Sequence, residues 1–566
     1  MTGLVAVARR PGAWARVWAR SRWSGSWSRW GPGVVAALAL LAIVTALWQL
    51  EAATRGLDVQ KLTLGSTPVT VFRPAALTVV PAAPAGGPAP VVLIAHGFAG
   101  SQQLMQPFAT TLARNGFVAI TFDFPGHGRN SAPMFGGLAD QPRSQRTLLQ
   151  AMEEMGRYAA QLAAANGGGG RYAVVGHSMA SDIVVRHAQS QAQGAVQAAV
   201  GVSLFAPSIK AETPPDSPRN LLVIAGALEP GVMAREALRV VGRVGGPGAV
   251  ADTLYGRFED GTARRATLAP GVEHIGVLYS GHTLTETLNW LNAAFGRPPA
   301  KQPFVDVRGP ALGWLLLGVV ALAWPLSRWL PHVGSIALST PRVGAVALPT
   351  GPRRRWRGWR GQAALTLLPA VLTPLLLWKL PTHVLPLLLG DYLVLHFALY
   401  GALTAAGLWL AGHRPPRWTP GRGLALAVAM VLVSAYAVLA VGLPVDRYIF
   451  NVQPEAVRLP LLLAMCAGTL PWFLADEWLT RDGHAARGAY LASKAAFLLS
   501  LVAAIALNPQ RLFFLAIIVP AVLVLFVVYG LFSRWAEKST GHPGVAAVAN
   551  ALAFGCFIAV TFPLVA

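Results

Sequence analysis

Long uncharged apolar segments are the feature that most constrains how this chain of 566 residues folds. The first, GPGVVAALALLAIVTALWQL at residues 31–50, is about as long as a bilayer core requires. Such segments recur from residue 309 onward, and the sequence therefore predicts an integral membrane protein with about nine spans. After the first, we place them near 309–330, 362–380, 384–411, 422–443, 457–475, 491–507, 511–533 and 544–565. The third of these is long enough to be a tilted helix or to contain a re-entrant part.

Composition agrees with a membrane protein and argues against two other classes. Hydrophobic residues make up 54% of the chain and charged residues 12%, about half the charged fraction of soluble domains. The net charge of +22 would suit nucleic-acid binding, but arginines gather beside apolar segments, as topology signals do, so we expect no nucleic-acid partner. Cys466 and Cys556 both lie in apolar runs, which argues against a disulfide framework and a cysteine metal site. We expect neither a metal nor another cofactor.

The distribution of arginines along the chain predicts four parts. Residues 1–30 hold several arginines and no acid, and we interpret them as a basic cytoplasmic N-terminus. Residues 31–50 then form an uncleaved signal anchor, because the apolar run is long and lacks a clear cleavage site. Acidic residues appear in 52–308, which we expect to be an extracytoplasmic soluble domain. Residues 309–566 form a membrane domain with about eight transmembrane helices.

The loops between the expected spans allow a check of this topology. With the N-terminus inside, the arginine-rich loops 331–361, 411–421 and 533–544 all fall on the cytoplasmic side. The soluble domain then lies outside. We expect a bacterial inner (cytoplasmic) membrane protein whose soluble domain lies in the periplasm.

The soluble segment alternates strand-like and helical runs. Strand-like runs include PVVLIAHG, FVAITFDF, YAVVGHS, AAVGVSLFAP and NLLVIAG, with helical stretches at 104–114, 144–164 and 179–190. This alternation predicts an α/β fold with a mostly parallel sheet and helices on both faces. Active sites in such folds lie at the carboxyl ends of the strands.

One strand end, VVGHSMA at residues 174–180, has the form of a nucleophile turn. Ser178 follows a strand directly and precedes a helix, and the small residues Gly176 and Ala180 would let the two pack closely. The helix N-terminus would present free N–H groups to a developing oxyanion. A serine after a glycine-rich strand end is common, so this segment alone is a weak signal.

The segments at the neighbouring strand ends strengthen the interpretation of Ser178 as a nucleophile. The segments AHGFAGS (95–101), FDFPGHGRN (122–130) and GHSMA, in this order and spacing, resemble the α/β-hydrolase superfamily over about residues 60–297. The resemblance implies that Ser178 is the nucleophile and that the backbone N–H groups of Phe98 and Met179 form the oxyanion hole. The residues expected to support the site are His96, Gly97, Gly176 and His177. Asp123, His127 and Asp182 are expected to be structural.

The same resemblance implies an order of nucleophile, acid and histidine. Glu229, in ALEPG after the strand LLVIAG, takes the acid position, with Asp252, Glu259 and Asp260 as rivals. Glu259 and Asp260 are less favoured because they lie at the expected tip of a hairpin, which would hold them at the surface. His274, in VEHIG, is favoured as the base over His282, which begins the final helix.

Two departures from the family pattern affect access to the site. Only KAETPPDSPR separates SLFAPSI from NLLVIAG, so we expect no large cap and an open site that would suit a bulky or membrane-presented ester. Glu229 and His274 are unusually far apart in the sequence, and residues 231–267 would form a small flap or a partner contact.

The sequence thus predicts a membrane-anchored extracytoplasmic serine hydrolase (of carboxylesterase or lipase type) that acts on a small-molecule or lipid acyl substrate. An acyltransferase of the same fold, and a non-catalytic binding or scaffold ectodomain, remain alternatives. A transporter with the hydrolase as a processing unit is a further one, although no transport motif stands out. Within the spans, Asp391 and His396 mark either a polar pathway or a contact between helices.

Overall fold

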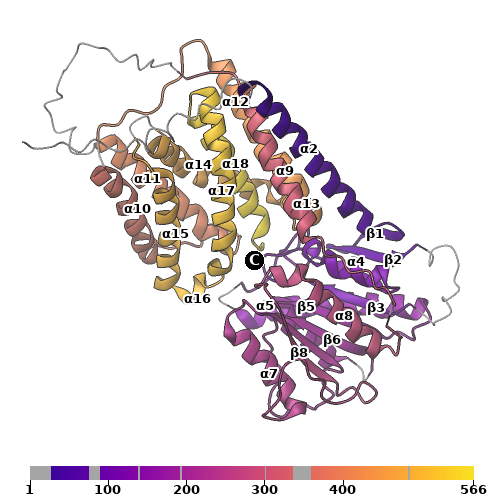
Figure 1. Ribbon diagram of the computed structural model, residues 1–566. Helices are drawn as coiled ribbons and strands as arrows, with labels where there is room; N and C mark the ends of the chain where they lie inside the picture. The colour runs from indigo at the N-terminus through magenta and orange to yellow at the C-terminus, as the bar shows by residue number, and fades with distance from the viewer. Residues whose placement is uncertain are drawn as a thin grey trace, which may run out of the picture.

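The computed structural model describes residues 27–75, 89–137, 140–191, 194–299, 301–334, 359–481 and 485–566. They form an α/β domain and a bundle of long helices that lie side by side (Figure 1). The basic N-terminal segment 1–26 and most of the arginine-rich loop 331–361 lie outside the described residues.

An eight-stranded sheet organises the α/β domain, with the strand order β1-β2-β4-β3-β5-β6-β7-β8. The first two strands form an antiparallel hairpin, and β2 pairs antiparallel with β4; all later pairs are parallel. The strands are β1 (Leu57–Leu64), β2 (Thr67–Pro74), β3 (Val91–Ala95), β4 (Val118–Phe122), β5 (Tyr172–His177), β6 (Val196–Val202), β7 (Leu221–Gly226) and β8 (Arg264–Ala269). The expected α/β class with a mostly parallel sheet is confirmed. The sequence analysis did not identify the opening hairpin.

Helices cover both faces of the sheet. The strands β3, β4 and β5 are buried at every position, as expected for strands enclosed on both sides. One core layer lies against α5 (Gln141–Ala165), α6 (Met179–Ser190) and α7 (Gly231–Gly245). The other lies against α4 (Gln106–Arg114) and α8 (Gly281–Ala294). Parallel strands held between two helical layers bring all their carboxyl ends to one edge of the domain.

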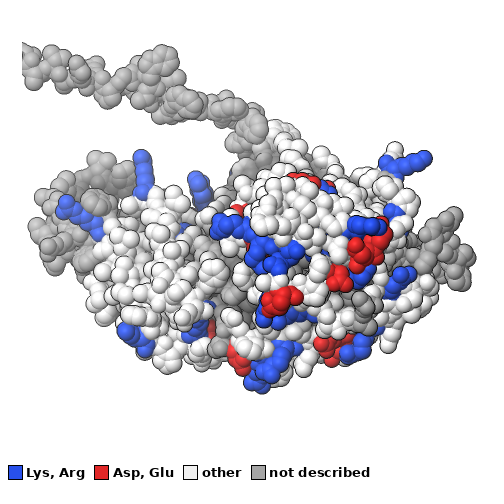
Figure 2. All heavy atoms as spheres, turned by 90° about the horizontal axis from the view of Figure 1, so that it is seen from below, with Lys and Arg blue, Asp and Glu red and all other residues white. Residues whose placement is uncertain are grey.

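The described part of the chain contains nine helices long and apolar enough to cross a membrane, which identifies a multi-pass membrane protein. On the face seen in Figure 2, acidic and basic side chains gather on the α/β domain, whereas the helical region shows few of them. The helices of this region are α2 (Trp27–Ala53), α9 (Gly309–Ser327), α10 (Trp359–Lys379), α11 (Gly390–Leu410), α12 (Gly423–Ala435), α13 (Val441–Tyr448), α14 (Leu459–Arg481), α15 (Ala489–Leu507), α16 (Pro509–Leu512), α17 (Leu515–Thr540) and α18 (Gly544–Thr561).

The long apolar segment 384–411 is only partly helical. The helix α11 begins at Gly390, and the residues just before it form bends and a turn in which Leu387 and Leu388 pair with the chain's last residues. The N–H of Leu388 donates to the carbonyl of Pro563, and Leu387 bridges to Leu564. The N–H of Leu564 donates in turn to Gly126 of the α/β domain, so this segment lies at the junction of the two regions.

Residues 231–267 do not form a flap. Their first half is α7, which lies against β7 and β8 as part of the regular helical layer. The second half includes a turn in which Tyr255 pairs with Arg264, and Glu259 at its tip is exposed. The extra length therefore extends the regular fold.

Candidate active site

The backbone at Ser178 has the conformation of a sharp strand-to-helix turn. Ser178 lies between β5 and α6 with φ 52° and ψ −116°, a strained conformation for a residue with a side chain. Gly176 makes the turn possible, because a Cβ there would lie 2.6 Å from the carbonyl oxygen of Ala180. The turn holds the Ser178 hydroxyl above the strand ends, where it is half-buried.

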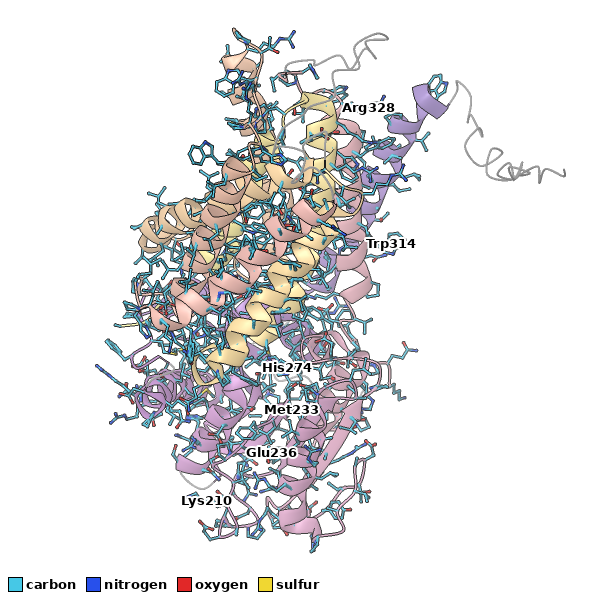
Figure 3. The ribbon with its side chains drawn as sticks, turned by 90° about the vertical axis from the view of Figure 1, so that its left-hand side faces the viewer. Lys210, Met233, Glu236, His274, Trp314 and Arg328 are labelled. Carbon is cyan, nitrogen blue, oxygen red and sulfur yellow. The ribbon has the colours of Figure 1, made fainter. Side chains whose placement is uncertain are left out.

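His274 lies next to this hydroxyl. Its Nε2 is 2.9 Å from Ser178 Oγ, although the two residues are 96 positions apart in the sequence. The imidazole follows β8 and precedes a short 3₁₀ turn, Gly276–Tyr279. In Figure 3, His274 is labelled where the α/β domain meets the helical region.

Glu229 completes a chain of hydrogen bonds. Its Oε1 accepts from Nδ1 of His274 at 2.5 Å, and its side chain is 1% exposed. The other oxygen, Oε2, accepts from the backbone N–H of Gly226 at 2.6 Å and from Ser203 Oγ at 3.0 Å. Three donors thus hold the carboxylate, which fixes the Nδ1–H tautomer of His274 and leaves Nε2 free to accept the proton of Ser178.

The residues expected to form the oxyanion hole lie on either side of Ser178. Phe98 follows β3, and the parallel pairing of Ala95 with Gly176 brings that loop beside the nucleophile turn. Met179 is the first residue of α6, so its N–H is one of the groups that a helix leaves without an internal partner. Gly97 permits the approach, because a Cβ there would lie 3.1 Å from the Cβ of Ser178.

His96 and His177 are buried supports around this site. Nδ1 of His96 donates to the carbonyl of Gly97 at 2.8 Å, and its Nε2 accepts from the N–H of Phe124 at 3.1 Å. Nε2 of His177 donates to the carbonyl of His274 at 3.0 Å. Burial, with the neighbouring His274, lowers the pKa of His177 to about 3, and burial also lowers the pKa of His96. Both imidazoles are therefore neutral hydrogen-bonding groups at ordinary pH.

Asp123, His127 and Asp182 lie in structural positions. Asp123 accepts from the N–H groups of Gln102 at 2.7 Å and of Arg129 at 3.0 Å. Burial lowers the pKa of His127 to about 3, and its Nδ1 donates to the carbonyl of Pro125. Asp182 accepts from the N–H of Ser208 at 3.2 Å and pairs with an arginine on its own helix.

The rival acids and the rival histidine lie in other contacts. Asp252 accepts from Thr267 Oγ1 at 2.6 Å, and the same hydroxyl lies 2.8 Å from Nε2 of His282. Asp260 accepts from Thr262 within its own turn, and Glu259 pairs with Arg257 on the surface. Among these candidates, the contact with His274 is made by Glu229.

Asp391 and His396 have separate partners, as their five-residue separation predicts. Asp391 lies 2.8 Å from Arg511, beside a cavity of about 470 Å³ that Gly136 and Gly137 of the α/β domain also line. His396 is fully buried and contacts Tyr392 at 3.3 Å and Ser500 at 3.2 Å.

Two contacts at this site are not predicted by the sequence. Ser203 comes from the end of β6, and its φ of 52° places its hydroxyl on Glu229. Phe514, just before α17, stacks on Phe98 with ring centroids 4.8 Å apart. A polar residue at a strand end was a signal for Ser203, whereas no local pattern marks a contact between residues over 400 positions apart.

Comparison with known proteins agrees with the fold. Residues 86–239 match the family model described as serine aminopeptidase S33, also called Hydrolase_4. The matched range includes Ser178 and Glu229 and ends before His274. A search of curated proteins finds no match.

Solved structures resemble a part of the chain. A predicted CIB-like hydrolase from Thermoplasma acidophilum is 14% identical, with 42% of this chain and 97% of that chain covered and a TM-score of 0.30. An E-2-(acetamidomethylene)succinate hydrolase is 15% identical, with 42% of this chain and 100% of that chain covered and a TM-score of 0.29. A membrane phospholipase A described as a bacterial virulence factor is 12% identical, with 50% of this chain and 97% of that chain covered and a TM-score of 0.28.

Proposed function

The chain carries an α/β-hydrolase domain joined to a multi-pass membrane region, and we propose that this domain is an extracytoplasmic serine hydrolase of carboxylic esters or related acyl compounds. The observation that carries the proposal is the hydrogen-bonded chain from Ser178 through His274 to Glu229. A serine hydroxyl is a weak nucleophile at neutral pH and needs a base that is itself oriented by a third group. The short contacts on both sides of His274 meet that requirement.

The proposed reaction has two halves. Ser178 Oγ attacks the acyl carbonyl carbon while Nε2 of His274 takes its proton, and the N–H groups of Phe98 and Met179 bind the oxyanion. His274 then protonates the leaving alcohol as the C–O bond breaks, and an acyl-enzyme remains. Water, activated by the same imidazole, releases the acid and restores Ser178. Glu229 orients the imidazole and stabilises its charged form throughout.

The position of the domain outside the cytoplasm is a second part of the proposal. It rests on the arginines of the loops 331–361, 411–421 and 533–544, which the positive-inside rule places in the cytoplasm. Arg328, labelled in Figure 3, lies at the end of α9 that is remote from the α/β domain. An alkaline phosphatase reporter fused after residue 308 should be active, and an inactive reporter would contradict this topology.

A fluorophosphonate probe tests the catalytic proposal directly. Full-length protein in membranes should be labelled, and the variant Ser178→Ala should not. A matched control is Ser190→Ala, at the far end of α6, which should label as the unmodified chain does. Absence of label on folded wild-type protein would overturn the proposal in favour of a binding or scaffold domain. Trapping of the acyl group by added alcohols or amines would distinguish an acyltransferase.

A further inference from the structure

Large apolar side chains lie exposed around the proposed triad. Phe205 is 55% exposed and Leu228 is 66% exposed, and Val232 and Ile275 are exposed as well. We refer to these four residues as the apolar rim. They lie in the segments that follow three neighbouring strands, β6, β7 and β8, with Val232 in the first turn of α7, so they belong to the edge of the domain where these strands end.

Each part of the apolar rim is tied to the site. The N–H of Phe205 donates to Ser181 Oγ at 3.3 Å, and that hydroxyl donates to the carbonyl of Ser178 at 2.6 Å. Leu228 immediately precedes Glu229, and Ile275 immediately follows His274. Phe205, Leu228 and Ile275 of the rim are therefore held next to the residues of the proposed triad.

The membrane region reaches the same edge of the α/β domain. Phe514 stacks on Phe98, whose N–H is the proposed oxyanion donor, and the membrane span α17 begins at the next residue, Leu515. Phe513, beside it, is 58% exposed. The start of one span is thus in direct contact with the loop that would bind the reacting carbonyl.

The exposed side chains of the apolar rim and of Phe513 suggest that an apolar group binds at this edge of the domain. Contiguous apolar surface on a protein marks a binding site, and here it lies at the end of a bilayer-spanning bundle. A small water-soluble substrate would gain nothing from four apolar residues around the opening. Phe513 and the apolar rim offer exposed apolar side chains at this edge of the domain, which would suit an acyl chain leaving the bilayer.

We propose that the substrate is an acyl lipid of the bilayer that holds the chain, and that its acyl group reaches Ser178 from the outer leaflet along Phe513 and the apolar rim. This inference rests on the serine hydrolase activity proposed above. Ser178 would take the acyl group from the lipid ester oxygen, which leaves as the alcohol with the proton from His274. Water would then release the free fatty acid.

The test uses the full chain reconstituted in vesicles of dioleoyl phosphatidylcholine and dioleoyl phosphatidylglycerol, each with a radiolabelled oleoyl group. Released oleate is compared with hydrolysis of p-nitrophenyl butyrate, a soluble ester. We expect both reactions with wild type. Leu228→Ser and Phe513→Ser should each lower the ratio of lipid to soluble-ester hydrolysis by about tenfold.

A matched control lies at the opposite edge of the sheet. Leu254 is 49% exposed in the loop between α7 and β8, and Leu254→Ser should keep the wild-type ratio. Soluble-ester hydrolysis without oleate release would overturn the lipid proposal and leave the hydrolase proposal standing. An unchanged ratio in both Leu228→Ser and Phe513→Ser would overturn the proposed route. Loss of both reactions in wild type, with no fluorophosphonate label, would overturn the hydrolase proposal itself.

Discussion

Arg458 donates a hydrogen bond to the backbone carbonyl of Gly126 at 2.6 Å and thereby joins the membrane region to the α/β domain. Its guanidinium also donates to the carbonyls of Ala559 at 2.7 Å and Phe562 at 2.9 Å, and the residue is 1% exposed. Gly126 belongs to the loop after β4, beside the proposed oxyanion loop. The two regions are therefore coupled through a buried polar contact close to the site.

Removal of this arginine should loosen the junction. Arg458→Met removes a donor from three buried carbonyls, of which that of Gly126 keeps the N–H of Leu564, and we expect a loss of about 3 kcal/mol in stability. Thermal unfolding in detergent measures it. Arg157→Met, on the exposed side of α5, is the control and should unfold at the wild-type temperature. Equal unfolding temperatures for the Arg458 variant and the wild type would show that the junction does not depend on this contact.

The contacts of Glu229 lead to a graded set of activities. Glu229→Gln keeps the shape of the side chain but loses the charge that orients His274, and replacement of this group in such triads lowers kcat by about 10⁴. Ser203→Ala removes one donor from the same carboxylate, so we expect a loss of only about tenfold. Rates on p-nitrophenyl butyrate, with the unfolding temperature as a control, measure both. Equal rates in the Glu229 variant and the wild type would exclude this carboxylate from the reaction.

Local signals explain how much of the site was predictable. The residues Ser178, Glu229 and His274 each lie within a few residues of the end of a strand, and the spacing of the motifs fits one fold. The contacts of Ser203, Arg458 and Phe514 depend on how distant segments come together, and no periodic pattern encodes that.

Hydropathy also does not distinguish the helical from the non-helical part of an apolar segment. The segment 384–411 is largely apolar, yet its first residues form bends and a turn that pair with the chain's end near Leu564. Pro381 and Pro386, which disfavour helix, were the available signal. The start of α11 at Gly390 follows from them.

Buried neutral histidines should make the α/β domain sensitive to acid. Burial lowers the pKa of His187 from 6.5 to about 4, and the pKa of His127 and of His177 to about 3. Below pH 6.5 the unfolded chain binds protons that the folded chain does not, so stability falls as the pH falls from 6.5 toward 4. Between its folded and unfolded pKa, each such histidine lowers the free energy of unfolding by up to about 1.4 kcal/mol for each pH unit of acidification.

His187 offers a test away from the site. Its Nε2 lies 2.8 Å from the hydroxyl of Tyr172, a contact that a glutamine amide can replace. His187→Gln should unfold at a temperature that falls less between pH 7 and pH 5 than that of the wild type. Parallel curves for the two proteins would show that this imidazole does not cause the acid sensitivity.

A buried ion pair within the membrane helices gives the last prediction. Lys494 of α15 pairs with Asp476 of α14, and both side chains are almost fully buried. The ammonium also lies 4.4 Å from the ring of Trp472 and 4.5 Å from that of Tyr490. Breaking such a pair from one side leaves an uncompensated charge, so Lys494→Met should cost about 3–5 kcal/mol in stability.

The matching double variant distinguishes the charge from the packing. In Asp476→Asn with Lys494→Met no charge is left alone, and because apolar or neutral replacement of a whole buried pair is often nearly neutral, we expect most of the stability to return. Unfolding temperatures of the single and double variants in the same detergent give the coupling energy between the two residues. A double variant as unstable as the single one would mean that Lys494 acts through its contacts with the aromatic rings and not through Asp476.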